Sequence, residues 1–150
     1  MENLTLVSEV KVSFEPPYTM RNRPTVSSSK DAYKILIDRW DKGLIQFLEE
    51  FKILLLSTAN RVLGIAEISL GGRDYTPVDM KTIFSIALKS SARKIILVHN
   101  HPSGKLIPSS SDLALTKKAV TAGKVLDIEI CDHIIVGIDG YYSLKDAGDF

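Results

Sequence analysis

The chain has 150 residues, of which 45% are hydrophobic and 25% charged, a composition typical of one globular domain. No apolar run reaches the roughly 18 residues needed to span a membrane, and the formal net charge of +1 gives little attraction for the phosphates of nucleic acids. Cys131 is the single cysteine, which excludes an intrachain disulfide and every cysteine-rich type of zinc site.

The N-terminal part is expected to be a strand followed by a loop. Residues 4–14 alternate partly between apolar and polar side chains and predict a strand. Residues 15–29 contain three prolines and end in three serines, which indicates a loop that leads to a helix N-cap. We therefore divide the chain into an N-terminal strand and loop, 1–29, and a main domain, 30–150. Because the N-terminus has an early acid and no long apolar run, it does not resemble a signal peptide, and we expect a cytoplasmic protein.

The main domain is expected to alternate between helices and strands. Apolar residues at helical spacing predict a first helix at 31–40. The elements expected after it are strands at 51–58 and 61–70 around an Ala59-Asn60 turn, a helix at 79–90, a strand at 94–99, a helix at 109–123 that stops at Gly123, and two short strands within 126–138 before an Asp139-Gly140 hairpin turn. This order predicts an α/β fold with a mixed, curved sheet flanked by helices.

Two histidines at the end of an apolar strand indicate a metal site. Alternate residues of a strand point the same way, so the imidazoles of His99 and His101 can converge on one ion. Asp112, from the following helix, can add a third ligand and leave a fourth position for water. Ser109 and Asp112 also have the spacing of a helix capping box. Asp112 can fill both roles only if its side chain turns toward the histidines.

The spacing of these residues resembles that of a known enzyme family. His99, His101, Ser109 and Asp112 match the pattern H-x-H-x₇-S-x₂-D of the JAMM-motif metalloproteases of the JAB/MPN type. The neighbouring HNHPSG segment, the Asp132-His133 pair and the Asn60-Arg61 turn are similar to the JAB domain of RadC-family proteins, and the similarity covers roughly residues 30–147.

The resemblance implies a fold, a metal and a reaction. The fold is the JAB/MPN fold, which is cytidine-deaminase-like, and the metal is one Zn²⁺ per chain held by His99, His101 and Asp112. The implied reaction is hydrolysis of peptide or isopeptide bonds by a metal-activated water. The family places a glutamate beside this water, which alignment assigns to Glu49, with Glu50 as the alternative, and Ser109 would stabilise the oxyanion.

Three functions remain open at this point. The first is the metalloprotease-like hydrolase, whose partner would be a peptide or protein. The second is a DNA-repair-associated role, as the RadC name implies. Longer RadC proteins carry an N-terminal DNA-binding segment for which about thirty residues are too few, and the charge is nearly balanced, so we expect weak DNA binding at most. The third is a non-catalytic, metal-bearing scaffold. Asp132 and His133 are interpreted as a structural pair near the site, and Cys131 as a small buried hydrophobic residue.

Overall fold

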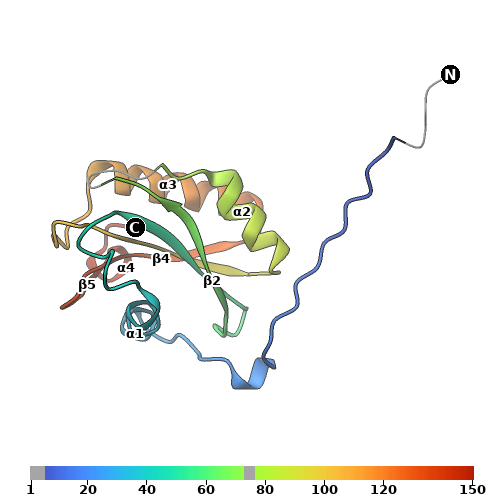
Figure 1. The fold of residues 1–150 in the computed structure, drawn as a ribbon, viewed down its shortest axis with the longest axis horizontal. Helices are drawn as coiled ribbons and strands as arrows, with labels where there is room; N and C mark the ends of the chain where they lie inside the picture. The colour runs from blue at the N-terminus through green and yellow to red at the C-terminus, as the bar shows by residue number, and fades with distance from the viewer. Residues whose placement is uncertain (1–5, 73–76) are drawn as a thin grey trace.

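The computed structural model describes residues 6–72 and 77–150, which form one five-stranded sheet with helices on both faces (Figure 1). The elements are a short 3₁₀ helix η1 (Met20–Asn22), α1 (Ser29–Arg39), β1 (Glu50–Leu56), β2 (Val62–Leu70), α2 (Met80–Lys89), β3 (Lys94–Asn100), α3 (Ser110–Val125), β4 (Glu129–Val136), β5 (Tyr141–Ser143) and α4 (Leu144–Ala147). Among these described residues, no helix is both long and apolar enough to cross a membrane.

The sheet has the order β2-β1-β3-β4-β5 and is mixed. Strands β3 and β4 are parallel, and the other neighbouring pairs are antiparallel. Parallel neighbours need a crossover connection, and α3 provides it between β3 and β4. The predicted α/β class, with a mixed sheet flanked by helices, is therefore confirmed.

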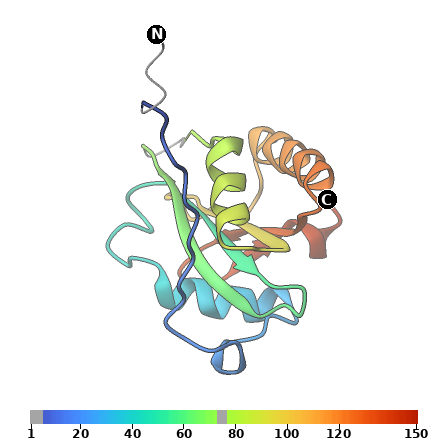
Figure 2. The same ribbon diagram turned by 90° about the vertical axis from the view of Figure 1, so that its right-hand side faces the viewer.

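The two faces of the sheet are covered by different helices, as Figures 1 and 2 show. Odd-numbered residues of β1 and β3, such as Ile53 and Leu97, pack in one core with α2 and α3. Even-numbered residues, such as Leu54 and Val98, pack in a second core with α1. This alternation follows from the two-residue period of a strand. It decides which side chains can reach a site on either face.

The strand expected at residues 4–14 is not formed over the part that the structure describes, residues 6–14. These residues pair with no strand in the described part of the chain, and the remainder of the predicted strand lies outside it. Leu6, Val10 and Val12 are all more than 70% exposed, and Figure 1 shows the segment extending away from the sheet. Alternation alone does not supply a neighbouring strand, and without one the backbone groups gain no ladder hydrogen bonds. The predicted N-cap at the end of the loop is confirmed, because the Ser28 side chain accepts a hydrogen bond from Asp31 N–H.

The C-terminal third differs from the prediction in three places. Helix α3 continues past Gly123, which is needed for close packing, because a Cβ there would lie 2.3 Å from the carbonyl oxygen of Ile128. The chain turns instead at Asp127, which has a positive φ of 55°. The two short strands predicted within 126–138 are one strand, β4. Helix α4 was not predicted, although Ser143 caps its start and Gly148 ends it with a φ of 80°.

Candidate metal centre

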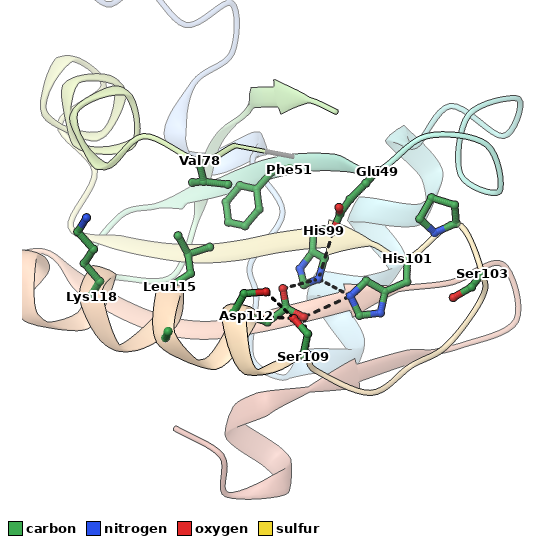
Figure 3. A pocket seen from close by; sticks show the side chains of 13 residues that line it. Glu49, Phe51, Val78, His99, His101, Ser103, Ser109, Asp112, Leu115 and Lys118 are labelled. Atoms are coloured by element: carbon green, nitrogen blue, oxygen red, sulfur yellow. Dashed lines mark hydrogen bonds and ion pairs between the residues drawn. The ribbon is translucent and has the colours of Figure 1, made fainter. Parts of the chain in front are cut away.

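Four side chains with metal-binding atoms meet where β3 ends, on the face covered by α2 and α3 (Figure 3). Glu49 precedes β1, His99 lies in β3, His101 follows β3, and Asp112 lies in the first turn of α3. Phe51 pairs with His99 across β1 and β3. Because alternate residues share a face, Glu49 and His101 reach the same side of the sheet as this pair.

The distances between these side chains are short. His99 Nε2 lies 2.8 Å from His101 Nε2 and 3.2 Å from Asp112 Oδ1, and His101 Nε2 lies 3.3 Å from Asp112 Oδ2. Glu49 Oε1 is farther away, 4.0 Å from His99 Nε2. Two ligands about 2.0 Å from a tetrahedral zinc ion are about 3.3 Å apart. The two histidines and Asp112 therefore have nearly the spacing of a three-ligand zinc site, with the Glu49 carboxylate beside it.

Asp112 caps α3, and its carboxylate also turns toward the two histidines. Its Oδ2 accepts a hydrogen bond of 2.7 Å from Ser109 N–H, and Asp112 N–H donates to Ser109 Oγ at 3.2 Å. This is the predicted capping box at the start of α3. The same carboxylate faces His99 and His101. The helix cap thus holds the side chain in the orientation that a metal site requires.

Each histidine of the cluster has a partner for its other ring nitrogen. His101 Nδ1 lies 2.8 Å from the carbonyl oxygen of Lys105. A carbonyl only accepts, so Nδ1 carries a proton, and in the neutral imidazole Nε2 has its lone pair toward the cluster. His99 Nδ1 lies 2.8 Å from Nε2 of His133, which is fully buried in β4. Such partners behind ligating histidines are typical of metal sites, where they fix the orientation of the ring.

The charges within the cluster are strongly coupled. Burial raises the pKa of Asp112, but hydrogen bonds from His101 and His99, made when their Nε2 atoms are protonated, outweigh burial and hold this pKa well below its usual range. The hydrogen bond to Asp112 raises the pKa of His101, although burial opposes the shift. Metal ions bind neutral imidazole and ionised carboxylate. A cation and protons therefore compete for this cluster, and the donor set of two imidazoles and one carboxylate fits a divalent metal ion.

The sequence that carries this cluster matches a known family. A family model described as "RadC-like JAB domain" covers residues 26–149. The chain belongs to the RadC-like JAB domain family. A UPF0758 protein of Flavobacterium johnsoniae is 43% identical over 127 residues, which are 83% of this chain and 53% of that relative. A UPF0758 protein of Methanosarcina mazei is 42% identical over 123 residues, 82% of this chain and 52% of that relative.

Membership of this family agrees with the observed fold, and the relatives extend beyond the matched region. The mixed sheet of this RadC-like JAB domain, with helices on both faces, is consistent with the JAB/MPN fold that the motif predicted. The chain spans about half the length of the curated relatives it matches. A match over half their length does not extend the activity, substrates or partners of those longer proteins to this chain.

The two candidate glutamates of the RadC-like JAB domain face opposite sides of the sheet. Glu49 lines the cavity around the histidines. Glu50 is buried 3.5 Å from Lys52, whose ammonium lies 4.4 Å from the centre of the Trp40 ring on the α1 side. Burial raises the pKa of Glu50, and Lys52 partly opposes the shift. The geometry thus places Glu49, and not Glu50, next to the cluster, while its role in catalysis stays a prediction.

A cavity of about 420 Å³ extends from the cluster along α3. Ser109 lies on its rim, and Phe51, Val78 and Leu115 form an apolar wall (Figure 3). Sequence reasoning did not identify Val78, Leu115 or Thr116 as neighbours of the site. The signal for two of them was present, because Leu115 and Thr116 follow Asp112 by three and four residues and therefore share its side of the helix.

Proposed function

We propose that this chain is a zinc-dependent hydrolase of the JAMM type that cleaves peptide or isopeptide bonds. The convergence of His99, His101 and Asp112 within 2.8–3.3 Å of one another supports this most directly. Two imidazoles, one carboxylate and an open position suit Zn²⁺, with one ion per chain. Bound there, the ion would lower the pKa of a water molecule and polarise the scissile carbonyl.

The remaining steps belong to Glu49 and Ser109. Glu49 lines the cavity 4.0 Å from His99 and lies farther from the cluster than its three other members, which suits a proton acceptor for the water better than a ligand. It would pass that proton to the leaving amine. Ser109 Oγ accepts the cap hydrogen bond, so that bond does not use its own hydrogen. Ser111 Oγ lies 2.8 Å away, and either hydroxyl of this pair can donate. The Ser109 hydroxyl hydrogen can turn to a substrate oxyanion without loss of the cap.

The walls of the cavity favour a peptide or protein as the substrate. Phe51, Val78 and Leu115 offer an apolar surface for an aliphatic side chain beside the scissile bond. The net charge of +1 provides little attraction for a phosphate backbone, so we propose that DNA binds weakly at most. The DNA-associated alternative receives no support from this surface.

A substrate screen with and without metal tests the proposed activity. Zinc-loaded and metal-stripped protein would be incubated with a panel of peptides and of isopeptides joined through a lysine ε-amine, and new amines would be measured. We expect cleavage by the zinc-loaded protein alone. Zinc bound at one equivalent with no substrate cleaved would favour the third alternative, a non-catalytic metal-bearing scaffold.

Ser109→Ala is expected to slow turnover by about 10²–10³-fold if Ser109 stabilises the oxyanion. It should also cost about 1 kcal/mol of stability through the lost helix cap. Ser28→Ala is a matched control, because Ser28 caps α1 through a hydrogen bond of the same 3.2 Å length and lies outside the cavity. Both variants should lower Tm, and only Ser109→Ala should lower kcat. A wild-type kcat in Ser109→Ala would restrict Ser109 to capping.

A further inference from the structure

The two histidines of the cluster differ in what lies behind them. The partner of His101 Nδ1 is a carbonyl, which can only accept a hydrogen bond. The partner of His99 Nδ1 is the Nε2 atom of another imidazole, His133, at 2.8 Å. A neutral imidazole nitrogen either donates or accepts, depending on the tautomer. The tautomer of His133 therefore decides whether His99 Nε2, which faces the cluster, carries a proton or a lone pair.

A hydrogen bond with Thr116, at the other nitrogen of the His133 ring, fixes that tautomer. The Thr116 hydroxyl donates its hydrogen to the carbonyl oxygen of Asp112 at 2.7 Å. Because a hydroxyl has one hydrogen, Thr116 Oγ1 must accept from His133 Nδ1, which lies 2.6 Å away. His133 Nε2 then carries no hydrogen and accepts from His99 Nδ1–H. This leaves the lone pair of His99 Nε2 directed at the cluster.

The opposite arrangement would block the site. If His133 carried its proton on Nε2, that N–H would donate a hydrogen bond to His99 Nδ1. Neutral His99 would then carry its own proton on Nε2. That proton would lie between His99 and His101, whose Nε2 atoms are 2.8 Å apart. This is the space that a shared metal ion would occupy. Thr116 and His133 are both buried, at 3% and 0% exposure, so water does not substitute for either partner.

We propose that Thr116 and His133 form a hydrogen-bond relay that fixes His99 as the Nδ1–H tautomer and so prepares its Nε2 to bind metal. The relay rests on the proposed metal site. It begins at the backbone carbonyl of Asp112 and ends at the ring of His99, so it links two members of the cluster through α3, β4 and β3. Thr116 and His133 do not line the cavity, and we assign them as positioning residues.

The tautomer of His133 can be measured without any metal. The chain has three histidines, so a long-range ¹H–¹⁵N correlation spectrum of the metal-free protein is assignable with single histidine variants. We expect His133 to carry its proton on Nδ1. A proton on His133 Nε2 would overturn the relay, whatever the protein binds.

Zinc affinity tests whether the relay contributes to metal binding. Thr116→Val keeps the shape of the side chain and removes the acceptor for His133 Nδ1, and Thr116→Ser keeps the hydroxyl as the matched control. By competition with a chromophoric chelator, we expect Thr116→Val to bind zinc about 10–100-fold more weakly and Thr116→Ser to bind it as the wild type does. Equal affinity of folded Thr116→Val and wild type would overturn the relay. A wild type that binds no zinc would instead refute the proposed function, and the His133 tautomer would still test the relay.

Discussion

Glu49→Gln is expected to keep its zinc and to lose hydrolysis by about 10²–10⁴-fold, because an amide cannot accept the proton of the attacking water. The Glu49 carboxylate is 4.0 Å from His99 Nε2, whereas the three proposed ligands lie within 2.8–3.3 Å of one another. Its replacement should therefore leave the ligand set intact. Zinc content and kcat measured on the same preparation separate binding from catalysis.

Glu50→Gln is the matched control for this experiment. It makes the same chemical change one residue further along, at a side chain that faces Lys52 and α1. We expect zinc content and kcat close to those of the wild type. An active Glu49→Gln together with an inactive Glu50→Gln would reverse the assignment. If neither change affects an activity that depends on zinc, neither glutamate is the proton acceptor.

Asp112→Ala is expected to weaken zinc binding by more than about 100-fold, beyond the 10–100-fold typical of residues that contact only a ligand. The same carboxylate accepts the 2.7 Å hydrogen bond from Ser109 N–H. Loss of this cap should also lower the free energy of unfolding of the metal-free protein by about 1 kcal/mol. Zinc at 100 times its Kd should raise the free energy of unfolding of the wild type by about 2.7 kcal/mol, and that of the variant by far less. Thermal unfolding with and without zinc measures both effects.

Asp112→Asn separates the two roles of this side chain. Its amide oxygen can still accept the cap hydrogen bond, but it is a much weaker metal ligand than a carboxylate. We expect the metal-free Tm to stay near that of the wild type and the zinc-dependent rise in Tm to be lost. Wild-type zinc affinity in Asp112→Ala would remove Asp112 from the metal site and leave it as a helix cap.

The sequence predicted the part of the site that depends on short-range geometry. His99 and His101 share a face because strand residues alternate, and Asp112 lies one helical turn after its cap. The same alternation separates Glu49 from Glu50 once the chain is known to be extended there. These relations join residues close in sequence or in adjacent strands, so periodicity and spacing are sufficient to predict them.

The parts that could not be predicted depend on contacts between distant segments. The relay requires β4 to lie parallel to β3 with His133 opposite Leu97, and no local pattern specifies that register. Gly123 resembled a helix stop, yet it stays in the helix because Ile128 packs against its backbone. The alternating segment at 6–14 resembled a strand, but a strand forms only where a neighbour supplies hydrogen bonds.

The zinc content of the untagged protein tests the central claim most directly. After equilibration in zinc-containing buffer and removal of free metal, elemental analysis should give about one zinc per chain, because one His₂Asp cluster is proposed to hold one ion. The Asp112→Asn protein, treated in parallel, should retain far less. A folded wild-type protein that remains metal-free under these conditions would contradict the account of this site.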